Sequence, residues 1–132
     1  MESVLASWRP QFLSLLRIAS GLLFLQHGTA KWLGVPALPQ YANLSITTLS
    51  GVAGAIELVA GALLVLGLFT RPIAFVASGL MAAAYFLAHA PTSFFPIVNR
   101  GELAALYCFV FLYLAASGGG AWSLDRALRK TD

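Results

Sequence analysis

The sequence is poor in charged residues and contains a single cysteine. Of its 132 residues, 10% are charged and 59% are hydrophobic. A soluble domain carries roughly 25% charged residues, and one of this length could not bury so much apolar surface. The scarcity of charge therefore excludes an ordinary soluble domain. It indicates one integral membrane domain covering residues 1–132.

The lack of paired cysteines, of clustered basic residues and of known catalytic motifs excludes several functional classes. Cys108 is the only thiol, so the chain has neither an internal disulfide nor a CxxC redox pair, nor a cysteine-rich zinc or iron–sulfur site. The basic residues are scattered and the formal net charge is only +3, which argues against a nucleic-acid partner. The sequence also contains no HExxH zinc motif, phosphate loop, dinucleotide fingerprint or nucleophile elbow.

Four apolar stretches, separated by segments rich in proline and glycine, predict four transmembrane helices. About 20 helical residues cross a hydrocarbon core of about 30 Å. The predicted helices cover approximately residues 10–32, 49–69, 72–90 and 102–117, followed by a short amphipathic tail at 123–130. The predicted fold is an all-α membrane protein, a bundle of four transmembrane helices.

The distribution of positive charge predicts the orientation. Four crossings place both termini on the same side of the membrane. That side would hold Arg9, Arg71, Arg126, Arg129 and Lys130, and the opposite side only Lys31 and Arg100. The positive-inside rule therefore predicts that both termini are cytoplasmic and that the chain is a multi-pass protein of the bacterial plasma (inner) membrane.

Polar residues within the predicted helices gather at one depth. Ionisable groups inside a membrane are costly and are therefore candidates for function. Those predicted in the outer half of the bilayer come from all four helices: His27, Lys31, Glu57, Tyr85, His89 and Glu102. They predict a ligand-binding pocket open to the outer side. Glu57, between two glycines, should face the interior, held by Arg17, His27 or Lys31.

Each of these residues also has a structural interpretation. Arg17, alone in the inner half, either snorkels to the headgroups or forms a structural ion pair with Glu57. Interfacial anchoring alone could explain the residues near helix ends, which are His27, Lys31, His89 and Glu102. Two histidines at similar depth could ligate haem, or a metal together with a carboxylate. Because no other haem or metal feature is readable, neither is predicted.

Five motifs occur in an order and spacing that resemble one family. They are Arg17-x3-Gly21-x2-Phe24-x2-His27-Gly28-x2-Lys31, Glu57-x3-Gly61, Leu66 to Arg71, Asn99-x-Gly101-Glu102-x3-Leu106-Tyr107, and Ser123-Leu124-Asp125. From about residue 12 to 128, the chain resembles the DoxX family of membrane proteins. It departs from the family pattern at Arg100, where a second glycine is common.

This resemblance implies a four-helix integral membrane protein that acts as a small subunit of a membrane redox system. Some family members resemble subunits of thiosulfate:quinone oxidoreductase, and others are linked to oxidative-stress assemblies. The leading hypothesis is therefore a quinone-interacting subunit, with Tyr85 and Tyr107 stacking on the ring or handling protons. Expected partners are membrane lipid, redox partner subunits and a second copy of the chain. Whether the chain is itself an oxidoreductase stays open.

Two other functions remain open at this point. A membrane scaffold would recruit soluble partners, with the basic tail from Arg126 to Lys130 as its docking surface. A small transporter or lipid-handling bundle would place Arg17 and Glu57 on a translocation path and would need to oligomerise, because four short helices enclose little space.

Overall fold

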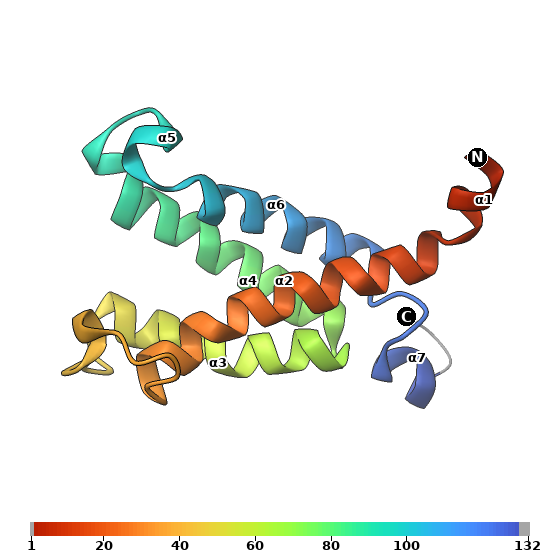
Figure 1. Cartoon of the computed structure of the whole chain (residues 1–132), viewed down its shortest axis with the longest axis horizontal. Coiled ribbons are helices and arrows are strands. Elements are labelled where there is room, and N and C mark those ends of the chain that lie inside the picture. Colours follow the sequence, from red (N-terminus) through yellow and green to blue (C-terminus); the bar gives the residue numbers. More distant parts are fainter. Residues whose placement is uncertain (1, 130–132) are drawn as a thin grey trace.

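The computed structural model describes residues 2–129, and this part of the chain is built from helices without strands (Figure 1). The α-helices are α1 (Glu2–Ser7), α2 (Arg9–Trp32), α3 (Leu49–Leu66), α4 (Thr70–Ala84), α5 (Pro96–Asn99), α6 (Glu102–Ser117) and α7 (Leu124–Arg129). The other helical turns are η1 (Pro39–Tyr41), the π-helix η2 (Tyr85–His89) and η3 (Ala90–Thr92). Of the predicted tail at 123–130, Lys130 lies outside the described residues.

Local chemistry sets the ends of α3. Its N-cap is Thr48, whose side-chain oxygen accepts a hydrogen bond from the Gly51 N–H at 3.0 Å. The helix ends at Gly67, which adopts a left-handed conformation with φ of 72°. The predicted helix at 49–69 is therefore too long, because Gly67 and the left-handed Phe69 turn the chain into α4.

The four long helices form two closely packed pairs, α2 with α3 and α4 with α6. Glycines allow the first pair to approach closely: a Cβ at Gly28 would overlap the backbone nitrogen of Leu58, and one at Gly61 would lie 2.7 Å from the Leu25 Cα. The two pairs come together near the termini and diverge toward the end that carries α5 (Figure 1).

The core lies where the two pairs meet. Phe24, Leu64, Phe111 and Leu114 are fully buried there. The ring of Phe24 packs edge-on against Phe111, with centroids 4.9 Å apart. This aromatic layer fills the interior of the helix assembly between its two ends.

The outward faces of the long helices are apolar, whereas α2 and α3 each bury a charged side chain inside. Large exposed hydrophobic residues include Leu22, Val59, Leu66, Phe75, Phe86, Leu106 and Phe109. Arg17 and Glu57, by contrast, are 1% and 3% exposed. This distribution is suited to a lipid solvent. Two segments, Leu49–Leu66 and Thr70–Thr92, are long and apolar enough to cross a membrane. At 16 residues, α6 is an apolar but shorter helix.

The last described helix is tied back to the turn between α3 and α4. The Asp125 carboxylate accepts hydrogen bonds from the Phe69 N–H at 2.7 Å and the Thr70 N–H at 2.9 Å. It therefore satisfies amide groups at the start of α4, and its negative charge suits a helix N-terminus. The two ends of the described chain lie at the same end of the molecule (Figure 1).

Candidate functional site

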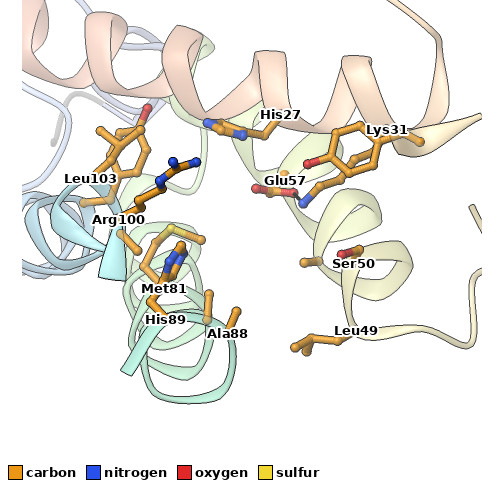
Figure 2. Close-up of a pocket in the computed structure, with 15 residues that line it drawn as sticks. His27, Lys31, Leu49, Ser50, Glu57, Met81, Ala88, His89, Arg100 and Leu103 are labelled. Carbon is orange, nitrogen blue, oxygen red and sulfur yellow. Dashed lines mark hydrogen bonds and ion pairs between the residues drawn. The ribbon is translucent and has the colours of Figure 1, made fainter. Parts of the chain in front are cut away.

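A cavity of about 340 Å³ lies between the two helix pairs, at the end where they diverge. It is lined by residues of α2, α3, α4, η2 and α6 and by loop residues. The structure brings four of the six predicted pocket residues to this cavity: His27, Lys31, Glu57 and His89 (Figure 2). These residues are far apart in the sequence and meet only through the packing of α2, α3 and η2.

A buried ion pair forms one wall of the cavity. The Lys31 Nζ lies 2.7 Å from the Glu57 Oε1, and both side chains are largely buried. Gly54 leaves room for the lysine, because a Cβ there would lie 2.8 Å from the Lys31 Cδ. The Lys31 ammonium also lies 5.7 Å from the centre of the Tyr41 ring. Glu57 thus faces the interior, and its partner is Lys31, one of the three candidates from the sequence.

Tyr107 contributes a polar group that the protein leaves unpaired. Its side chain lines the cavity and is 4% exposed, and its hydroxyl has no hydrogen-bond partner among the described residues. The ring stacks on Phe111 with centroids 5.3 Å apart. Because buried hydroxyls are normally hydrogen-bonded, this one is suited to a ligand. The sequence suggested Tyr107 as a proton-handling residue but did not include it in the pocket.

The two histidines approach the cavity from different helices. His27 lies on the α2 side, whereas His89 lies across the cavity with Met81 and Ala88 (Figure 2). Both rings are half-buried. The His89 Nδ1 lies 3.0 Å from the Asn99 carbonyl oxygen, a contact that orients the ring. Within residues 2–129, no cluster of three His, Cys, Asp or Glu side chains is arranged to hold a metal ion.

Arg100 joins the site from a loop. It adopts a left-handed conformation with φ of 62°, and its guanidinium points across the cavity toward the α2 side and His27 (Figure 2). A non-glycine residue in this region is uncommon and often marks a functional position. From the sequence, Arg100 served to assign the topology and marked a departure from the family pattern, but it was not placed in the pocket. That departure was the available signal, because a position where glycine is common often has a left-handed backbone.

Tyr85 and Glu102 do not line this cavity, unlike the other four residues of the predicted pocket. The Tyr85 hydroxyl accepts a hydrogen bond from the Asn99 Nδ2 at 3.3 Å, and its ring packs against Gly101. The side of α4 and η2 that lines the cavity carries Met81, Ala84 and Ala88, so Tyr85 turns to the loop instead. Glu102 is exposed at the first turn of α6, beside a separate surface hollow.

Arg17 does not line the cavity, and its hydrogen-bond partners differ from those expected from the sequence. Its Nε donates to the Leu64 carbonyl oxygen at 2.8 Å, its Nη2 to the Trp122 carbonyl oxygen at 2.8 Å, and its Nη1 to the Gly119 carbonyl oxygen. It therefore neither snorkels to the surface nor pairs with Glu57. The guanidinium joins the last turn of α3 to the segment before α7, which is a structural role.

The comparison with protein families matches the DoxX model over residues 12–90, more than half of the chain. The chain belongs to the DoxX family. The DoxX match covers most of α2, all of α3, α4 and η2 and the segments between them, and so includes His27, Lys31, Glu57 and His89. Tyr107 and Arg100 lie beyond the matched region, on α6 and on the loop before it.

Two related proteins extend the similarity over most of the chain. An uncharacterized protein of Haemophilus influenzae is 47% identical over 130 residues, covering 96% of this chain and 97% of the relative. An uncharacterized membrane protein of Mycobacterium tuberculosis is 30% identical over 140 residues, covering 87% of this chain and 80% of the relative. No solved structure matches the chain. This DoxX protein is a membrane protein, as its outward apolar faces also indicate.

Proposed function

We propose that this DoxX protein crosses the bacterial plasma membrane four times, through α2, α3, α4 with η2, and α6. The exposed apolar faces of all four segments support this arrangement. At about 1.5 Å per residue, α6 spans about 24 Å, so the bilayer must thin locally around it. Arg9, Arg71 and Arg126 mark the end of the molecule that would be cytoplasmic, together with both termini. The cavity then opens in the outer half of the membrane.

The cavity, in this proposal, binds the headgroup of a quinone. The observation that carries the proposal is the unpaired hydroxyl of Tyr107 in a cavity that also contains the Lys31–Glu57 pair. A quinone presents a flat ring with two carbonyl oxygens, each of which accepts a hydrogen bond. The Tyr107 hydroxyl would donate to one oxygen, and an N–H of His27 would donate to the other. The apolar remainder of the wall suits the ring.

The proposed setting is a subunit of a membrane redox system. Reduction of a bound quinone takes up two electrons and two protons. His27, His89 and the Lys31–Glu57 pair are titratable groups at the cavity and would exchange those protons. The electrons would come from a partner subunit of the same system. Membership of the DoxX family supports this setting, because some members resemble subunits of thiosulfate:quinone oxidoreductase and others are linked to oxidative-stress assemblies.

The contacts of Arg17 argue against the transporter alternative. Its guanidinium is bound to three backbone carbonyl groups. The fully buried Phe24, Leu64 and Phe111 lie in the core that separates this cluster from the cavity. A polar path through both Arg17 and Glu57 would have to pass this apolar layer.

Replacing Tyr107 by phenylalanine tests the proposal. The ring keeps its packing while the unpaired hydroxyl is removed, so the variant should fold as the wild type does. Wild-type protein in lipid nanodiscs should bind ubiquinone with a short, two-isoprene tail, and Tyr107→Phe should bind it roughly tenfold less tightly, the effect of about 1.4 kcal/mol. The matched control is Tyr113→Phe on the same helix, where the residue is 59% exposed.

Equilibrium titration with ubiquinone would measure both affinities, and circular dichroism would verify the fold. Absence of quinone binding by the wild type would refute the proposed ligand. Equal affinities for the Tyr107→Phe and Tyr113→Phe variants would refute the assigned role of Tyr107. An absorption spectrum and mass spectrum of the gently purified protein would identify any quinone, haem or lipid that it retains.

A further inference from the structure

One side of the cavity is bordered by two helical segments that carry small residues. The first turn of α3 contributes Leu49 and Ser50 to the rim, and η2 contributes Ala88, on the opposite side (Figure 2). All three rim residues are exposed, whereas Ala53 and Met81, deeper in the same cavity, are buried. The cavity thus reaches the molecular surface between α3 and η2.

Two features of the chain hold this side of the cavity open. After the turn at Gly67–Phe69, α3 and α4 diverge along their length (Figure 1). In addition, α4 changes into the π-helix η2 at the level of the cavity, and this segment lines the cavity there with the small residues Ala84 and Ala88. π-Helical turns are rare and occur frequently at functional sites. Small side chains at this position leave room that larger residues would fill.

The rim combines the apolar Leu49 and Ala88 with the polar Ser50, and outward residues close to them in the chain are apolar. Val52 on α3 is 45% exposed, and Leu87 on η2 is 63% exposed. The helix α3 is one of the two segments that are long and apolar enough to cross a membrane, and η2 is part of the other. In the proposed orientation, therefore, the opening between α3 and η2 meets the hydrocarbon of the outer leaflet rather than water.

The size of the cavity limits what it can contain. Its volume of about 340 Å³ is at the lower end of the roughly 300–1,000 Å³ typical of small-molecule sites. A ring-sized headgroup fits this volume, but a long hydrocarbon tail does not. A ligand with such a tail must leave the tail outside, and Leu49, Ala84 and Ala88 provide an apolar exit for it.

We infer that the ligand enters sideways from the outer leaflet, between the first turn of α3 and η2. Its headgroup reaches Tyr107 and the Lys31–Glu57 pair, while its apolar tail lies over Ala88 and remains in lipid. The identity of the headgroup rests on the proposed function. The lateral entrance rests on the position of the cavity opening and on the apolar residues at its border.

Filling the opening tests the inference. Ala88→Phe places a large side chain at the rim, and Ala83→Phe is the matched control, because Ala83 is an exposed residue of α4 that does not line the cavity. Binding to nanodisc-embedded protein would be measured for ubiquinone with a ten-isoprene tail and for its tail-less ring analogue. Ala88→Phe should weaken binding of the tailed quinone at least tenfold and that of the tail-less ring less than twofold. Ala83→Phe should change neither affinity.

An equal effect of Ala88→Phe on both quinones, or no effect on either, would overturn the lateral entrance.

A second measurement separates this inference from the quinone proposal. Protein without quinone would be placed in phospholipid with a photoreactive diazirine on the acyl chain, and the crosslinked residues would be identified by mass spectrometry. In the absence of a headgroup, the end of an acyl chain is small enough to enter the cavity. A diazirine at that end should therefore label the buried Ala53 and Met81 as well as the outward Val52 and Leu87, and Ala88→Phe should abolish only the buried labels. Labels confined to outward residues would overturn the lateral entrance, even if quinone binds. Buried labels without quinone binding would support the entrance and refute the quinone.

Discussion

Arg17 and Glu57 are buried charged residues that are stabilised in different ways. Arg17 donates to three backbone carbonyl oxygens, whereas Glu57 is neutralised by the ammonium of Lys31. One of these oxygens, on Leu64 in the last turn of α3, also accepts a hydrogen bond from the Gly67 N–H at 3.2 Å, so Arg17 supplies a second donor at this helix end. Only the second charge lies at the cavity. Burial of a charge therefore does not by itself distinguish a structural residue from a candidate functional one.

Arg17→Lys should destabilise the protein by at least about 2 kcal/mol, because an ammonium lacks the planar fork that reaches three separate carbonyl groups. Arg9→Lys is the control, since Arg9 is exposed on the first turn of the same helix. Thermal unfolding in detergent would compare the two variants with the wild type. Equal melting temperatures for the two variants would contradict the assigned role of the Arg17 hydrogen bonds.

The Lys31–Glu57 pair should behave as one unit. Lys31→Met and Glu57→Gln each leave a buried polar group without its partner, so the double variant should be more stable than the sum of the single effects implies. The expected coupling is about 0.5–3 kcal/mol. A double-mutant cycle of unfolding free energies would measure it, with Glu102→Gln as the exposed control. Strictly additive losses would show that the 2.7 Å contact contributes nothing to stability.

At the scale of elements, the close contact between α2 and α3 depends on glycine. Gly28→Ala should destabilise the protein by about 2 kcal/mol or more, because the new Cβ would overlap the backbone of Leu58 and force the helices apart. Gly79→Ala is the control: a Cβ at Gly79 meets open space, and alanine should stabilise α4 by roughly 0.5–1 kcal/mol. Unfolding of both variants in detergent would reveal the opposite signs. A neutral Gly28→Ala would mean that the helices are less tightly packed than described.

The third predicted helix shows how an element can be located correctly while its faces are misassigned. The apolar stretch at 72–90 predicts one regular helix, with Tyr85 and His89 on a shared face. In the structure, α4 ends at Ala84 and the chain continues as a π-helix. The side of this segment that faces the cavity is therefore not the side expected for a regular helix. Ala84 and Ala88 line the cavity, and the Tyr85 ring packs against Gly101. No residue in this stretch indicates, from the sequence alone, that the α-helix changes into a π-helix.

For the whole molecule, the predicted orientation can be tested by labelling single cysteines with a membrane-impermeant thiol reagent. In a Cys108→Ser background, Ser45→Cys should react in intact bacterial cells whose outer membrane is permeabilised, and Ala127→Cys should react only after lysis. Both positions are exposed in the structure. The physical reason is the excess of positive charge at the end that carries the termini. Reaction of Ala127→Cys, but not of Ser45→Cys, in intact cells would reverse the orientation.

The sequence by itself determined the membrane character and the positions of the long helices, because both follow from local composition and hydrophobic run length. It also indicated that Glu57 faces inward, since flanking glycines are a local signal. Tertiary structure decided which polar residues meet. Arg17 binds carbonyl groups that lie 47 to 105 positions away, and Arg100 reaches the cavity from a loop because its own backbone is left-handed. Such contacts depend on helix rotation and loop conformation, neither of which is encoded in the periodicity of any single helix.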